Sequence, residues 1–117
     1  VGSKKLLKSD KKNYQMDFKN SDEAIREVAM DINEGADMVM IKPALPYLDV
    51  ITKIKQRFNI PIFAYQVSGE YAILKLGEKE KVLNYEKSLF ENLISIKRAG
   101  ASAIFTYGAI DIAKKIK

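Results

Sequence analysis

Short runs of apolar residues alternate along this chain with longer stretches in which apolar residues recur every three or four positions. The helical spacing predicts four helices, over residues 21–34, 46–57, 84–98 and 110–117. The short runs predict three strands, at residues 37–42, 61–67 and 101–107. The first is nearly continuous in apolar residues, which is typical of a parallel strand buried on both faces. Because helices and strands alternate, the sequence favours an α/β fold with parallel strands and crossover helices.

The remaining segments are expected to lack long regular elements. Residues 1–18 have few apolar positions and are predicted to be loop, with a short ordered segment at 13–16. After the second strand, residues 68–71 are predicted to form a turn, 71–76 one helical turn and 77–81 a loop. Three strands are too few to close a (β/α)8 barrel, which needs eight strands and about 250 residues. The pattern therefore leaves two alternatives, a small open α/β domain or a piece of a barrel.

Two glycines, Gly35 and Gly100, each end a predicted helix that is followed by a strand. Lys42 lies seven residues after Gly35, and Tyr107 lies seven residues after Gly100. If the two units are equivalent, both side chains reach the same level of the sheet, at the carboxyl ends of its strands. Proteins of the α/β class place their chemistry at this edge.

Lys42 is the strongest local indication of chemistry. It ends an apolar strand and precedes Pro43, so its amine either reaches solvent at the rim of the sheet or lies beneath a loop. Desolvation and nearby positive charge lower the pKa of a lysine, and the neutral amine can then attack a ketone and form a Schiff base. The residues alone leave a solvated lysine as the alternative.

Tyr65, Ser68 and Tyr107 are the other polar residues at the predicted strand ends. A serine and a tyrosine from neighbouring strands can jointly hold a carboxylate through neutral hydrogen bonds. Alternatively, the tyrosines are packed aromatic residues and Ser68 is a turn former. The convergence of the three residues on one rim favours a binding site.

Composition limits the classes of function. With 47% hydrophobic and 30% charged residues, the chain is typical of a globular protein. No apolar run approaches the roughly 20 residues that span a bilayer, so we expect a cytoplasmic protein without a membrane partner. Cysteine and histidine are absent, so a metal bound here would need oxygen ligands, which suit Mg²⁺ better than Zn²⁺. The net charge of +5 comes mainly from scattered lysines rather than clustered arginines, and nucleic-acid binding is not expected.

Two further regions carry charged residues with more than one interpretation. Lys11, Lys12 and Gln15 lie in the N-terminal loop, which either binds an anion at a barrel mouth or is simply solvated. Glu27 lies on the first predicted helix, where a single carboxylate is typical of an exposed surface. No pair of carboxylates at metal-ligand spacing stands out, and no glycine-rich phosphate loop or G-x-S-x-G elbow is present.

Several segments of the chain resemble one known family. They read YQMD at residues 14–17, MVMIKP at 38–43, YQVSGEY at 65–71, SIKRAGA at 95–101 and IFTY at 104–107. Their residues and spacing resemble the porphobilinogen synthase (5-aminolevulinate dehydratase) family over nearly the whole chain. The resemblance implies the C-terminal βα units of a TIM (β/α)8 barrel, incomplete on its own. Residues 1–20 are then an active-site loop region, and residues 21–117 are the last three βα units.

The resemblance also implies an activity. The family, a group of hydro-lyases, condenses two molecules of 5-aminolevulinate to porphobilinogen in heme biosynthesis. Lys42 matches the lysine that forms a Schiff base with the first substrate, and Ser68 and Tyr107 match the residues that hold its carboxylate. Lys11 falls where many members carry an arginine for the second substrate's carboxylate, and Gln15 belongs to the same region.

Metals and partners are implied in the same way. Glu27 falls where some bacterial members have a ligand for an allosteric Mg²⁺. The second active-site lysine and the region that binds a catalytic Zn²⁺ or Mg²⁺ have no counterpart in these residues. The implied partners are 5-aminolevulinate, the remaining part of the barrel and further copies in a homo-oligomer, an octamer in the family. The two hypotheses are a fragment that works within a full barrel, and a catalytically inactive fragment or assembly module.

Overall fold

The computed structural model describes residues 21–116, with side chains described as far as Lys114. The loop predicted at residues 1–18 lies outside the described residues. The elements are, in chain order, α2 (Ser21–Asn33), β1 (Val39–Ile41), the short 3₁₀ helix η1 (Leu45–Tyr47), α3 (Leu48–Arg57), β2 (Ile62–Gln66), α4 (Ser68–Lys79), α5 (Tyr85–Ala99), β3 (Ala103–Thr106) and α6 (Ala109–Ile116). In this part of the chain no helix is long and apolar enough to cross a membrane.

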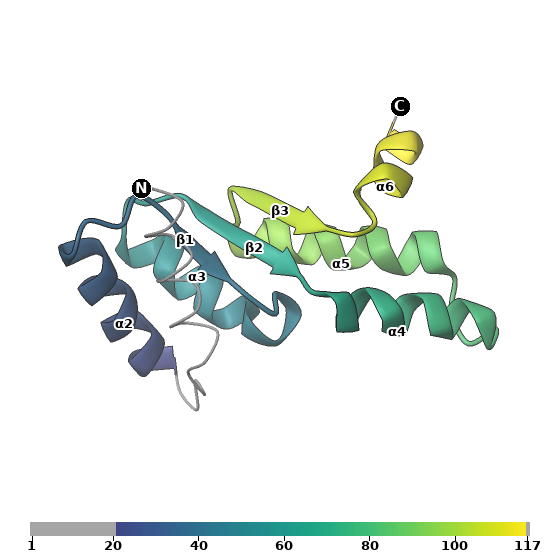
Figure 1. Ribbon diagram of the computed structural model, residues 1–117, viewed down its shortest axis with the longest axis horizontal. Helices are drawn as coiled ribbons and strands as arrows, with labels where there is room; N and C mark the ends of the chain where they lie inside the picture. Colours follow the sequence, from purple (N-terminus) through teal and green to yellow (C-terminus); the bar gives the residue numbers. More distant parts are fainter. Residues whose placement is uncertain (1–20, 117) are drawn as a thin grey trace.

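The three strands form one parallel sheet in the order β1-β2-β3 (Figure 1). Ile41 of β1 lies opposite Ala64 of β2, and Tyr65 of β2 lies opposite Phe105 of β3. Each strand reaches the next through helices on the same side of the sheet, with α3 between β1 and β2 and α5 leading into β3 (Figure 1). The predicted parallel α/β architecture is therefore confirmed, although each strand is shorter than its apolar run.

The main core lies between the sheet and the helices α3 and α5. Its largest fully buried side chains are aliphatic: Ile51, Ile54, Ile62 and Ile96. Burying a side chain of this size contributes about 1.5–3 kcal/mol to folding. The outer helix α2 adds Ala24 and Val28 to the same core, whereas Ala29 of the same helix is exposed.

Both glycines predicted to end helices do so. Gly35 has a φ of 99° and Gly100 a φ of 126°, a backbone conformation that favours glycine because it has no Cβ. The Gly100 N–H donates to the carbonyl oxygens of Ile96 and Lys97 at the end of α5. At the other end of α5, the Asn84 side chain caps the first turn by accepting from the backbone of Lys87.

The helix α4 corrects the sequence prediction of a turn at 68–71, one helical turn at 71–76 and a loop at 77–81. Residues 68–79 instead form one continuous helix that includes Gly69 and Gly77. A Cβ at Gly77 would lie 2.6 Å from the Cδ2 atom of Leu83, so this glycine allows the turn after α4 to pack closely against the helix. Gly77 is required for packing between two segments, whereas the sequence pattern around a glycine usually indicates a helix end.

Candidate active site

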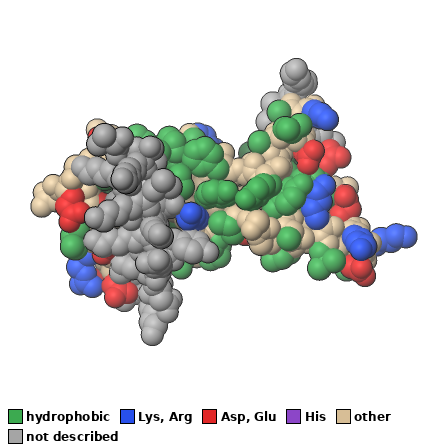
Figure 2. Space-filling view, in the orientation of Figure 1, with side chains coloured by type: hydrophobic (Ala, Val, Ile, Leu, Met, Phe, Trp, Pro, Cys, Tyr) green, Lys and Arg blue, Asp and Glu red, His purple; other side chains and the backbone are tan. Residues whose placement is uncertain are grey.

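One face of the sheet carries polar and aromatic side chains from the strands. Along β2, Ile62, Ala64 and Gln66 are buried on the helix-covered side, while Phe63 and Tyr65 are half-buried on the other side. Figure 2 shows hydrophobic side chains gathered over the strands in the middle of the molecule. Among the described elements only one face of the sheet is covered by helices (Figure 1), which differs from the expectation that the first strand is buried on both faces.

Lys42 and Tyr107 do not lie at the same level of the sheet, contrary to the equal spacing of each from its glycine. Ile41 lies opposite Ala64, and Ala64 lies opposite Ile104. Lys42 is therefore level with the residue that follows Ile104, and Tyr107 lies two residues further along. Because side chains alternate with a period of two along a strand, this offset keeps Lys42 and Tyr107 on the same face.

The offset arises in the segments that lead from each helix to its strand. Ile41 lies six residues after Gly35, whereas Ile104 lies four residues after Gly100, although the two isoleucines are at one level. The first connection therefore uses two more residues than the second to reach the sheet. Equal spacing along the chain did not translate into equal position in the fold.

Lys42, Tyr65 and Tyr107 lie together on the uncovered face. The Lys42 Nζ is 5.5 Å from the centroid of the Tyr65 ring, within the range of a cation–π interaction. The Tyr65 hydroxyl donates a hydrogen bond to the Tyr107 hydroxyl at 3.3 Å. The pKa of Tyr65 is raised above its usual value, mainly because of this hydrogen bond. Burial and the charge of an ionised Tyr107 raise this pKa further. The structure thus brings three of the predicted site residues together.

Ser68 is the exposed first residue of α4. It follows β2 with one residue between, so it lies at the same end of the sheet as Lys42 and Tyr107. The backbone N–H groups at a helix start favour a negative charge. This location is compatible with a role in holding a carboxylate.

A series of aromatic rings continues from Tyr107 to α5. The ring of Tyr71 lies 5.8 Å from that of Tyr107 and 6.0 Å, edge to face, from that of Tyr85. Tyr85 is buried, and its hydroxyl donates to Asp111 of α6 at 2.7 Å. Burial and this hydrogen bond raise the pKa of Tyr85. The series joins the loop that carries Tyr107 to the buried cluster between α4 and α5.

Sequence reasoning did not single out Glu70, which the structure places next to the candidate site. Its carboxylate accepts backbone N–H bonds from Ala44, Leu45 and Val67 at 3.3, 3.2 and 3.0 Å. The bond within the first turn of α4 fits a glutamate three residues into a helix. The bonds to the segment after Lys42 span more than twenty residues, so no local signal could have revealed them.

The other predicted residues contribute less to the described geometry. Lys11 and Gln15 lie outside the described residues. Glu27 is half-buried on α2. Among residues 21–116, no group of three or more acidic, histidine or cysteine side chains could hold a metal ion, so Glu27 would need ligands from elsewhere.

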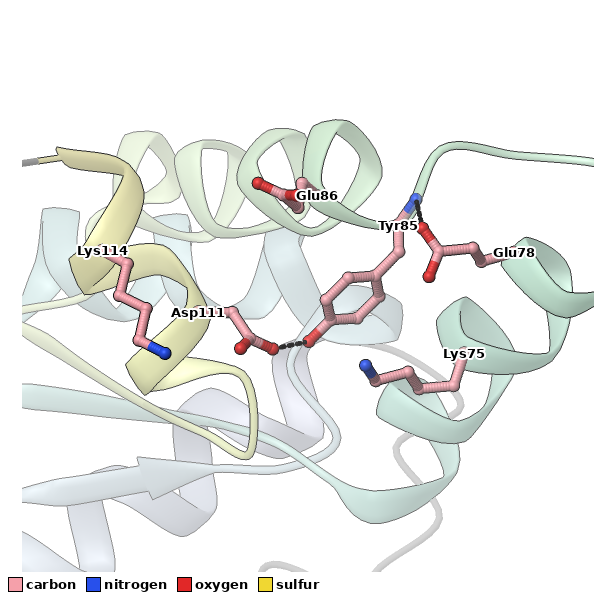
Figure 3. Close-up of a pocket in the computed structure, with 6 residues that line it drawn as sticks. All are labelled: Lys75, Glu78, Tyr85, Glu86, Asp111 and Lys114. Carbon is pink, nitrogen blue, oxygen red and sulfur yellow. Dashed lines mark hydrogen bonds between the residues drawn. The ribbon is translucent and has the colours of Figure 1, made fainter.

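A hollow of about 470 Å³ lies between the helices α4, α5 and α6. Six residues line it: Lys75, Glu78, Tyr85, Glu86, Asp111 and Lys114. Figure 3 shows the amines of Lys75 and Lys114 on either side of the Tyr85–Asp111 hydrogen bond. Lys75 Nζ also lies 4.0 Å from the centroid of the Tyr85 ring. The Tyr85–Asp111 hydrogen bond in this hollow connects α5 to α6.

Parallel βα units with polar side chains at the carboxyl strand ends define a piece of a (β/α)-barrel protein. A solved structure supports this class: delta-aminolevulinic acid dehydratase (porphobilinogen synthase) from Toxoplasma gondii ME49, in complex with the reaction product porphobilinogen, superposes with a TM-score of 0.83 at 50% identity. The match covers 86% of this chain and 29% of that chain.

Sequence comparison identifies the family. The family model for delta-aminolevulinic acid dehydratase matches residues 1–115, and the chain belongs to this family of lyases. The delta-aminolevulinic acid dehydratase of Bradyrhizobium diazoefficiens is 50% identical over 117 residues, which are 100% of this chain and 33% of that protein. That of Archaeoglobus fulgidus is 51% identical over 108 residues, 92% of this chain and 33% of that protein. The chain thus spans about a third of the length of these relatives.

Proposed function

We propose that this chain supplies the Schiff-base part of a porphobilinogen synthase site, which condenses two molecules of 5-aminolevulinate to porphobilinogen. One observation carries the proposal: in a member of this family, the Lys42 amine lies over Tyr65, whose hydroxyl is bonded to that of Tyr107. The three side chains share the uncovered face of a parallel sheet. In a complete barrel this face points into the interior, at the end where substrates bind.

The chemistry assigned to Lys42 is attack on the substrate ketone. The neutral amine adds to the carbonyl carbon, the carbonyl oxygen leaves as water, and a carbon–nitrogen double bond links substrate and lysine. Ser68 and Tyr107 donate hydrogen bonds to the carboxylate of the same substrate. Tyr65 holds the Tyr107 hydroxyl by donating to its oxygen, which leaves the Tyr107 proton available for that carboxylate.

The second substrate and the remaining barrel complete the site in this proposal. The family resemblance assigns the second carboxylate to Lys11 and includes Gln15 in the same substrate region, and the other βα units come from outside these 117 residues. Lysine keeps the charge of the arginine common in the family but lacks its bidentate geometry. Glu27 would be one ligand of an allosteric Mg²⁺, and a homo-oligomer would be the assembly.

Borohydride trapping tests the proposal. The chain is mixed with 5-aminolevulinate and sodium borohydride, alone and after association with the segment of the Bradyrhizobium relative that it does not cover. Borohydride delivers hydride to the imine carbon and leaves a stable secondary amine, which peptide mass spectrometry should locate on Lys42 in the associated form. The Lys42→Arg variant should give no adduct, whereas Lys79→Arg, an exposed change at the end of α4, should give as much as the wild type.

The same experiment separates the two hypotheses. An adduct that requires the complementing segment supports a working fragment of the enzyme. If neither form gives an adduct on Lys42, the Schiff-base role is wrong and the inactive assembly module is the better account.

A further inference from the structure

We propose that Glu70 is a positioning residue that fixes the distance between Lys42 and Ser68. The inference rests on the proposed function for the role of those two residues, but its geometry does not. The three hydrogen bonds of the Glu70 carboxylate come from backbone N–H groups rather than from the side chains of Lys42 and Ser68. Glu70 acts through the backbone on both sides of the site.

Three backbone N–H groups from two separate segments converge on the Glu70 carboxylate. The Oε1 atom accepts from Val67 at 3.0 Å and from Ala44 at 3.3 Å, and the Oε2 atom accepts from Leu45 at 3.2 Å. Ala44 lies two residues after Lys42, and Val67 directly precedes Ser68. One side chain therefore joins the segment that follows the lysine to the segment that presents the serine.

The environment strengthens these bonds. Glu70 is half-buried, and Ala44 is completely buried. Hydrogen bonds to an ionised acceptor are roughly twice as strong as neutral ones, and the first turn of α4 favours a negative charge there. The Ala44 N–H also donates to the carbonyl oxygen of Tyr65 at 3.1 Å, which holds the same segment against β2.

Replacing one carboxylate oxygen of Glu70 by an amide NH₂ group should loosen the segment after Lys42 without leaving a gap in the packing. In Glu70→Gln, one oxygen can still accept from Val67 and Ala44, but the amide NH₂ then faces the Leu45 N–H, donor against donor. Glu70→Asp keeps the charge and shortens the side chain by one methylene, so it cannot reach both segments. Glu80→Gln is the matched control, because it removes the same single negative charge at an exposed position just after α4.

The test combines two measurements on the chain associated with the complementing segment of the Bradyrhizobium relative. Amide hydrogen exchange at Ala44 and Leu45 should be faster in Glu70→Gln and Glu70→Asp than in wild type and Glu80→Gln. The rate of borohydride trapping at saturating 5-aminolevulinate, per folded molecule, should fall about 10- to 100-fold in both variants, because small misplacements of a reacting group have effects of this size. The KM for 5-aminolevulinate should change much less than this rate.

The outcomes separate the positioning role from the proposed function. Unchanged exchange, or an unchanged trapping rate beside faster exchange, would overturn the role assigned to Glu70. A loss of folded protein with a normal rate per folded molecule would make Glu70 merely structural and overturn it as well. If wild type traps no adduct, the proposed function fails and the role toward Lys42 chemistry fails with it, while the exchange data alone decide whether Glu70 joins the two segments.

Discussion

The hydroxyl of Tyr65 donates to the hydroxyl of Tyr107 across β2 and β3, at 3.3 Å, although the two residues are 42 positions apart in the chain. Because the Tyr107 oxygen accepts this bond, the Tyr107 proton can point to a further acceptor. A substrate carboxylate is the acceptor that the proposed function places there. In that proposal the two tyrosines act in series on one anion.

Removing the Tyr107 hydroxyl should weaken substrate binding in the associated enzyme. A hydrogen bond to a charged acceptor is worth about 1.5–3 kcal/mol, so Tyr107→Phe should raise the KM for 5-aminolevulinate at least about tenfold. Tyr65→Phe, which keeps the ring beneath Lys42, should have a smaller effect. In the double variant the Tyr65 substitution should add little, because its effect passes through Tyr107. Steady-state kinetics of the four proteins measure this, and additive effects would contradict the series.

Stability at high pH should depend on Tyr85. Its pKa is raised in the folded protein, whereas an unfolded tyrosine ionises at about pH 10. The stabilising contribution is therefore complete below about pH 10 and is lost as pH rises above this value, since the unfolded state then releases a proton that the folded state retains. Tyr85→Phe should be less stable than wild type near neutral pH, and the difference should narrow in alkali. Urea unfolding at several pH values measures it, and a constant difference would contradict the prediction.

The tight packing around Gly108 predicts a sensitive site next to Tyr107. A Cβ at this position would lie 2.4 Å from the Cδ2 atom of Leu89 and 3.0 Å from the Tyr85 hydroxyl oxygen. Leu89 is completely buried and cannot easily move, so Gly108→Ala should lower the free energy of unfolding by about 1–3 kcal/mol. Gly69→Ala is the control, because a Cβ there would meet no atom within 4 Å apart from its chain neighbours and the backbone of its own helix. Equal stability of the two variants in urea unfolding would argue against this packing.

Much of the fold was predictable because its signals are local. The apolar runs at 37–42, 61–67 and 101–107 each contain an observed strand, and the positive φ values at Gly35 and Gly100 explain why helices end there. The helix at 68–79 was predicted as a turn, one helical turn and a loop, because the reason for its buried Gly77 is the contact with Leu83 beyond the helix end. The candidate site was likewise predictable only in part. The lysine and tyrosines were identified at strand ends, but their relative level was not.

The sequence by itself determined that three strands run parallel, that helices connect them, and that Lys42 follows the first strand, since periodicity and chain breaks encode these features residue by residue. Tertiary structure alone decided the two-residue offset of Tyr107, the stacking of Lys42 on Tyr65 and the convergence of three N–H groups on Glu70. Each of these depends on the register between strands and on contacts across 23 to 42 positions of the chain, and such pairings arise only when the elements pack together.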